Sequence, residues 1–389
     1  MKKRVFVTAA VLLAACAVSD LDAMPAFARK YQMSCKTCHA PFPRLKPYGE
    51  EFAGNGFVIK DKDTPRTYID TGDDFLSLLR EVPLALRLEG FLTYNSGARK
   101  QLDFASPYLL KLLSGGEITK NISYYFYFFL GERGEVAGLE DAFVMFNDLF
   151  GTDVDVVVGQ FQVSDPLFKR EVRLTLEDYL IYKARPGRSR ASLTYDRGVM
   201  VTTGLPGDID LAFEVVNGTG IGEADIFRNF DEDKYKNVLL RLSRDFSPAA
   251  RLGAFGYVGK ERQDEVDNSV WMLGGDATFG AAPFELNLQY VERRDSRPFF
   301  APGPAGEVRT RGAFAELIYL PRGDDSRWYG VGLLNWVDSN QPDLETVSVT
   351  GSFGYLLRRN IRAIVEFTQV LDGPFGDHPR LAVGLVTGF

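Results

Sequence analysis

Hydrophobic and polar residues alternate along most of the chain after residue 83. Over 84–94, one face would carry leucines, Gly90 and Tyr94, whereas the opposite face would carry Arg87 and Glu89. A period of two residues predicts β-strands with one apolar and one polar face. Sixteen strands are expected, at 83–94, 107–118, 122–130, 139–147, 154–162, 196–204, 209–217, 236–244, 250–259, 268–279, 283–292, 309–320, 327–337, 344–357, 361–370 and 380–389.

The connections between these strands alternate in length, which separates a membrane barrel from a soluble sandwich. Short connections such as 119–121 and 206–208 are followed by longer ones such as 163–195 and 218–235. Short periplasmic turns and longer outside loops are typical of outer-membrane barrels, whose apolar face contacts lipid. The sequence therefore predicts an all-β fold, a sixteen-stranded antiparallel outer-membrane β-barrel over 83–389 with both ends in the periplasm.

The last strand supports this interpretation. Leu381, Val383 and Leu385 alternate ahead of the terminal Phe389, with Thr387 as a mild departure. A terminal Phe on an amphipathic strand resembles the barrel-assembly signal of outer-membrane proteins. A barrel of sixteen strands is also wide enough to enclose a lumen.

The first residues have the pattern of an export signal. Three basic residues at 2–4 precede an apolar stretch at 5–18, which is too short to span a bilayer as a helix. Cleavage after Ala23 gives a signal peptide of residues 1–23. A lipoprotein signal that leaves Cys16 as a lipidated terminus is the alternative. No later apolar run is long enough for a membrane helix, which excludes a helical membrane protein.

Composition excludes several other classes of protein. The 389 residues carry a net charge of −7, which argues against binding nucleic acid through a basic surface. With 45% hydrophobic residues the chain is too apolar for a disordered protein. Its 3 cysteines and 2 histidines are too few for a disulfide scaffold or for two zinc sites.

Two of those cysteines and one histidine fall in a single motif, Cys35-Lys36-Thr37-Cys38-His39. C-x-x-C-H is the attachment signal for c-type haem, in which two thiols bind the vinyl groups and the histidine binds the iron. A thioredoxin-like site would need a βαβ context, a zinc site would need four ligands, and a disulfide would not explain the adjacent His39. The motif predicts one covalent haem c on Cys35 and Cys38, with His39 as the proximal iron ligand.

The residues around the motif predict a small α-helical wrapper within 24–82. Short helices are expected over 25–31 and 45–52, and a linker helix over 75–79 after two acidic residues. Six aromatic residues could cover a porphyrin: Phe27, Tyr31, Phe42, Tyr48, Phe52 and Phe57.

The second axial ligand of the iron is left open. Met24 could fold back to it, whereas Met33 is close to the proximal side. A barrel methionine, at 145, 200 or 272, is a further alternative. The wrapper is short for a free-standing cytochrome, so we expect the haem to lie within the barrel mouth.

The pairing of this motif with a sixteen-stranded barrel resembles the outer-membrane monohaem cytochrome–porin fusions of iron-oxidising bacteria and their relatives. The similar blocks are 24–30 and 34–39, with Phe57. The segment 156–161 followed by the connection 163–195 is similar to porins whose third outside loop folds into the pore. The resemblance implies electron transfer across the outer membrane between an extracellular donor, with Fe(II) as the leading candidate, and a periplasmic cytochrome.

Two other functions compete with electron transfer. One is a solute porin whose haem-bearing plug gates or senses, favoured if Lys169, Arg170, Arg173 and Arg185 form a constriction ring. The other is a peroxidase-like enzyme, which is disfavoured because the motif has no distal histidine nearby. Acidic runs at 223–233 and 261–267 would attract Fe(II), although such runs are usually solvated loops.

Overall fold

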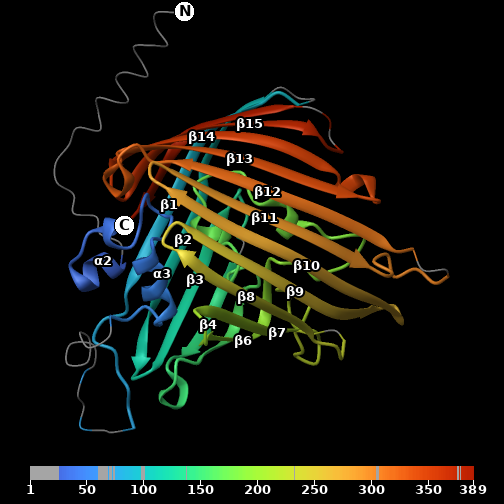
Figure 1. Ribbon diagram of the computed structural model, residues 1–389, viewed down its shortest axis with the longest axis horizontal. Helices are drawn as coiled ribbons and strands as arrows, with labels where there is room; N and C mark the ends of the chain where they lie inside the picture. Colours follow the sequence, from blue (N-terminus) through green and yellow to red (C-terminus); the bar gives the residue numbers. More distant parts are fainter. Residues whose placement is uncertain are drawn as a thin grey trace, which may run out of the picture.

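The computed structural model describes residues 26–59, 69, 72, 75–97, 101–136, 138–231, 233–303, 306–374, 376 and 378–389. Sixteen antiparallel strands form one closed barrel, which confirms the predicted fold class (Figure 1). The strands are β1 Leu84–Asn95, β2 Gln101–Thr119, β3 Ile122–Glu132, β4 Gly138–Phe146, β5 Asp155–Gln162, β6 Tyr195–Leu205, β7 Ile209–Val216, β8 Asn237–Ser247, β9 Ala250–Gln263, β10 Val266–Ala281, β11 Phe284–Asp295, β12 Val308–Tyr319, β13 Trp328–Ser339, β14 Thr346–Arg358, β15 Ile361–Asp372 and β16 Pro379–Gly388.

The barrel closes where the first strand meets the last. Strand β1 pairs with β16 in a continuous antiparallel register from Arg87 opposite Gly388 to Asn95 opposite Arg380. Leu86 and Phe389 complete this seam, because each backbone N–H donates to the carbonyl of the other residue. Closure removes the unpaired strand edges that would be costly in lipid.

The two faces of the wall differ as the alternation predicts. Along β1, Leu88 and Leu92 are exposed on the outer face, whereas Glu89 and Phe91 are buried inside. Rings of β11–β14 lie next to one another near the short turns, in the order Phe284, Tyr319, Trp328 and Phe353. Such an aromatic belt is typical of barrels at a membrane interface.

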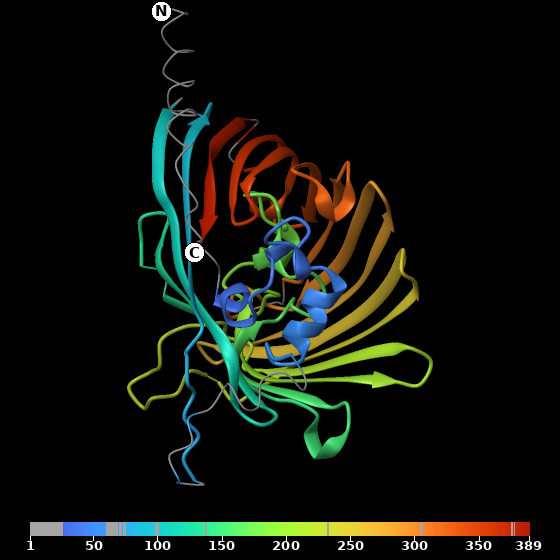
Figure 2. The same cartoon turned by 90° about the vertical axis from the view of Figure 1, so that its left-hand side faces the viewer.

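Short helices precede the barrel and lie between its strands. Before the barrel come α2 (Ala26–Tyr31), η1 (Cys35–Thr37) and α3 (Pro47–Gly54), and Figure 2 shows them in the barrel mouth. The connections contain η2 (Leu149–Gly151), η3 (Arg170–Val172), α5 (Leu180–Lys183), η4 (Gly323–Asp325) and η5 (Pro342–Leu344). Among the described residues, no helix combines the length and apolar character needed to cross a membrane.

The expected linker helix over 75–79 is wrong. Residues 75–80 are not helical, and Phe75 is fully exposed, while Leu76 and Leu78 are half-exposed. A five-residue helix needs tertiary packing to be stable, and these apolar side chains stay exposed. The acidic residues 73 and 74 lie outside the described residues, as do the predicted signal peptide and Met24.

Candidate haem-binding site

The C-x-x-C-H motif folds as one tight turn. Ser34 begins η1, and its hydroxyl accepts a hydrogen bond from the Lys36 N–H at 3.4 Å. The N–H groups of Cys38 and His39 both donate to the Cys35 carbonyl, at 3.3 and 2.9 Å. This turn brings two free, half-buried thiols and the imidazole together, which is the donor set that haem c requires.

His39 is held by its Nδ1 atom, which lies 2.8 Å from the Pro43 carbonyl oxygen. A carbonyl can only accept, so Nδ1 carries the proton and Nε2 keeps the lone pair that a metal needs. Burial lowers the pKa of His39 to about 4, so the ring is neutral at physiological pH. Burial likewise raises the pKa of both thiols, Cys35 and Cys38. The residues present therefore fit a c-type haem.

Helix α3 packs directly on the motif. A Cβ atom added at Gly49 would lie 2.4 Å from the Cys38 carbonyl oxygen, so this close approach needs glycine. The Lys46 N–H also donates to the Cys38 carbonyl at 2.8 Å. Beyond α3, Gly56 adopts a φ of +69° and ends the helix as its position predicts.

Four of the six predicted aromatic residues form one cluster. The ring of Phe27 lies 5.2 Å from Phe52 and 5.4 Å from Phe57, and Tyr31 lies 5.7 Å from Phe52. Phe42 instead contacts His39 edge-on, with the ring centres 5.0 Å apart. Tyr48 is 41% exposed and belongs to neither group.

The N-terminal segment docks on the barrel end that carries the short turns. Lys36 and Lys46 pair with Asp325 and Asp324 of the β12–β13 turn, and Arg44 pairs with Glu285 at the start of β11.

Across the same mouth, the segment contacts β3 and the β4–β5 turn. Phe57 stacks on Tyr125 of β3 with centres 4.6 Å apart, and Asn147 donates to the Gly54 carbonyl at 3.0 Å. Contacts on both sides hold the motif in the mouth (Figure 2).

The connection 163–195 folds into the lumen, as expected. On one side Lys111 of β2 pairs with Glu171 at 2.6 Å, and Glu366 of β15 accepts from the N–H groups of Leu176 and Glu177. On the other side Glu261 of β9 accepts from two backbone N–H groups, and Arg293 of β11 donates to two carbonyls of the loop. The loop thus bridges opposite walls.

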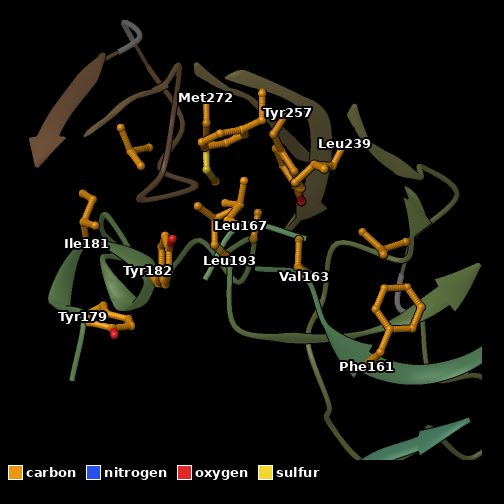
Figure 3. Close-up of a cluster of buried hydrophobic side chains, with 14 of the residues drawn as sticks. Phe161, Val163, Leu167, Tyr179, Ile181, Tyr182, Leu193, Leu239, Tyr257 and Met272 are labelled. Carbon is orange, nitrogen blue, oxygen red and sulfur yellow. The ribbon is translucent and has the colours of Figure 1, made fainter. Parts of the chain in front are cut away.

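Apolar side chains fill the space between this loop and strands β8–β13. Val163, Leu167, Ile181, Tyr182 and Leu193 of the loop pack on barrel residues that include Leu239, Tyr257 and Met272 (Figure 3). All of these side chains are buried. The loop and the wall therefore share a hydrophobic core in this half of the lumen.

The loop cations do not form one ring. Arg170 pairs with Asp178 at 2.5 Å, and Arg173 lies 4.0 Å from the same carboxylate. Burial alone would raise the pKa of Asp178, but these two arginines hold this pKa well below its usual range. Arg185 donates to the Ser192 and Thr194 hydroxyls instead. Only Arg170 and Arg173 of the four line the cavity of about 70 Å³ that separates the loop from the wall near β1 and β15.

The remaining candidates are accounted for by other contacts. Met145 and Met272 are buried in the lumen core and Met200 packs against it, which is the ordinary gap-filling role of methionine. Met33 lies beside the motif, where its N–H donates to the Ala28 carbonyl.

Carboxylates of the acidic outer loops form ion pairs with basic side chains. Asp231 pairs with Lys236, Asp264 with Arg188, and Asp267 with Lys260 and Arg262. Across the part of the chain that the structure describes, no group of three His, Cys, Asp or Glu residues is arranged to hold a metal ion.

Comparison with solved structures identifies the barrel type. The chain is similar to an anion-selective porin from Comamonas acidovorans, with 12% identity and a TM-score of 0.57, over 79% of this chain and 99% of that one. It is also similar to the outer-membrane channel DcaP of Acinetobacter baumannii, with 12% identity and a TM-score of 0.56, over 79% and 97%. A third similar structure is the Salmonella typhi OmpF complex with daunomycin, with 11% identity, a TM-score of 0.57 and the same coverage.

At these identities the likeness establishes the fold alone, a porin-like outer-membrane barrel. No protein-family model and no curated protein matches the chain. The haem segment and its chemistry therefore rest on the residues of the motif.

Proposed function

We propose that the protein is an outer-membrane electron-transfer cytochrome, with one haem c held in the periplasmic mouth of a porin-like barrel. The observation that carries the proposal is the folded C-x-x-C-H turn, with His39 Nδ1 held by the Pro43 carbonyl, docked among the short turns of the barrel. Its partners would be outer-membrane lipid, an extracellular electron donor and a periplasmic carrier cytochrome. Fe(II) is the leading donor, through the resemblance to iron-oxidising cytochrome–porin fusions.

Each part of the site has a role in this proposal. Cys35 and Cys38 would hold the haem covalently, and His39 would bind its iron through Nε2, oriented by the Pro43 carbonyl. A haem bound there would supply a one-electron Fe(III)/Fe(II) couple. The aromatic cluster of Phe27, Phe52 and Phe57 would exclude water on the side of the barrel wall.

The filled lumen favours electrons over solutes as the transferred species. The loop 163–195 bridges both walls and buries an apolar core across one half of the pore. A solute of porin size that enters this half would have to displace this core, whereas an electron would not. The apolar outer face and the aromatic belt fit an outer-membrane location, reached through the predicted signal peptide 1–23.

A solute porin with a haem-bearing plug is the second candidate, and the similarity to porins favours it directly. Purified protein in liposomes separates the two candidates. We expect a covalent haem that an outside donor reduces and that a periplasmic-type cytochrome in the liposome interior reoxidises, with little sugar influx. Rapid sugar influx that depends on the haem oxidation state would instead support the gated porin.

A further inference from the structure

A small charged cavity lies in the lumen between the loop 163–195 and the wall formed by β1, β2, β3, β4 and β15. Its lining carries six cationic side chains and five carboxylates, and one of those carboxylates, Glu171, is already paired with Lys111 outside the lining. Cations therefore outnumber carboxylates in the lining by one. Arg87 of β1, Arg173 of the loop and Arg362 of β15 reach it from three directions.

Arg362 is the least compensated of these cations. It is 3% exposed, and its Nη1 donates to the Tyr329 hydroxyl at 2.8 Å. Within the described ranges, no carboxylate lies within 4.0 Å of this guanidinium, and its Nε–H has no hydrogen-bond partner. Burying an unpaired cation is costly, so a counter-ion is expected beside it.

The two neighbouring arginines also have unused donors. Arg87 pairs with Glu89 through Nη2 at 2.5 Å, and Arg173 donates to the Arg170 carbonyl through Nη1. Both Nε–H groups are buried, and neither has a hydrogen-bond partner among the residues that the structure describes, although Arg173 Nε lies 4.0 Å from Asp178 Oδ1. Three buried guanidinium groups around one cavity thus each keep an Nε–H without a hydrogen bond.

We infer that Arg87, Arg173 and Arg362 form a binding site for an oxyanion. Guanidinium groups match the paired oxygens of carboxylates and phosphates in charge and in geometry. Two ligands have that chemistry. One is the pair of propionate carboxylates of the haem, an alternative that rests on the proposed function, and the other is a free anion such as phosphate.

A chain of contacts connects the cavity with the N-terminal segment. Arg87 is in register with Gly388, and the Phe42 ring approaches within 3.6 Å of a Cβ placed at that glycine. Phe42 in turn contacts His39.

The test uses the full chain in detergent, with and without haem. The haem-free form is the double variant Cys35→Ala, Cys38→Ala, and the probe is radiolabelled inorganic phosphate in equilibrium dialysis. We expect one saturable phosphate per haem-free chain, weakened about tenfold or more by Arg362→Gln, since a charge-assisted bond is lost. Arg358→Gln is the matched control, because Arg358 is exposed four residues away.

The haem-loaded protein then identifies the source. Phosphate binding that persists with haem bound supports a free anion, whereas binding only without haem supports the propionates. If the propionates are the ligand, Arg362→Gln should lower the midpoint potential of the haem, because a cation beside the haem is lost. Arg358→Gln should leave the potential unchanged. A lowered potential in Arg362→Gln alone supports the site even where phosphate does not bind.

Equal phosphate binding with and without Arg362 overturns the inference. If phosphate does not bind and the midpoint potential does not change, the inference of an oxyanion site is also overturned. The proposed function is tested separately, by whether haem is attached. Arg87→Gln, checked for heat-modifiable migration, repeats the test where Arg362→Gln fails to fold.

Discussion

At the residue scale, each group in the motif turn has a separate role. The Cys35 carbonyl closes the turn by accepting two N–H groups, and the Pro43 carbonyl fixes the imidazole of His39 through Nδ1. A ligating histidine is commonly oriented in this way by a carbonyl behind it. Attachment and ligation can therefore be separated by substitution.

Cys35→Ala or Cys38→Ala is expected to weaken covalent haem attachment, and the double variant to abolish it, because no other cysteine remains after residue 38. His39→Ala should keep part of the covalent haem and lose its low-spin spectrum. Haem-stained gels of the outer-membrane fraction and reduced visible spectra measure both effects. Haem staining that survives loss of both cysteines would contradict the attachment site.

Gly49 tests whether α3 must contact the motif. Gly49→Ala places a methyl group 2.4 Å from the Cys38 carbonyl oxygen, so we expect displacement of α3 and a cost of about 1–3 kcal/mol in the N-terminal segment. Haem content per chain and resistance of the segment to protease report the effect. Gly54→Ala is the control in the same helix, since a Cβ there meets nothing within 4 Å.

At the element scale, strands were predictable because lipid on one side and the lumen on the other impose a period of two residues. The expected strand 309–320 is β12, Val308–Tyr319, whereas the expected strand 107–118 begins earlier, at Gln101. That extension pairs residues 101–105 with β1, beyond a register shift that contains Ser106 and Pro107. Pairing partners decide such ends, and a single sequence does not display them.

The interior of the loop 163–195 was harder to predict than its position. Its entry into the lumen followed from its length and resemblance, but its hydrophobic packing depends on strands β8–β13, which are distant in sequence. The C-x-x-C-H motif can be recognised from the sequence alone, because its residues are neighbours in the chain. The linker helix was predicted wrongly, because local polarity indicated a helix start, whereas a helix this short depends on tertiary packing.

Arg293 is expected to hold the loop closed. It donates to the Ala184 and Ala191 carbonyls and pairs with Asp295, which is fully buried. Arg293→Ala leaves that carboxylate unpaired, at a cost of about 3–5 kcal/mol, and should release the loop from β11. Single-channel recording in planar bilayers should show a clear rise in ion conductance.

The adjacent Arg294 provides the control, because it pairs with Glu292 and Glu307 on the outer face. Arg294→Ala should leave the conductance at the parent level. Equal conductance in the two variants, with both barrels folded, would show that Arg293 does not close the pore.

At the scale of the whole molecule, the barrel depends on one seam between distant residues. Truncation of 380–389 removes the pairing of β16 with β1 and with β15, so backbone polar groups on both of these strands would face lipid. We expect loss of heat-modifiable migration and of surface protein. Phe389→Ala keeps the backbone pairing with Leu86 and should reduce assembly less severely; normal levels of the truncated chain would contradict this account of closure.

The two closures of the pore are also independent, which gives the sharpest test of a gating plug. The N-terminal segment contacts the short-turn end through Asp324, Asp325 and Glu285, whereas the loop 163–195 is anchored to β2, β9, β11 and β15. Deleting 26–59 while keeping the export signal removes the first closure and leaves the second. We therefore expect a folded barrel without haem whose conductance stays as low as that of the parent protein. Combining the same deletion with Arg293→Ala should raise the conductance above that of Arg293→Ala alone. A wide, stable pore from the deletion alone would mean that the segment is the gate, and the solute-porin function would then replace electron transfer as the better account of the molecule.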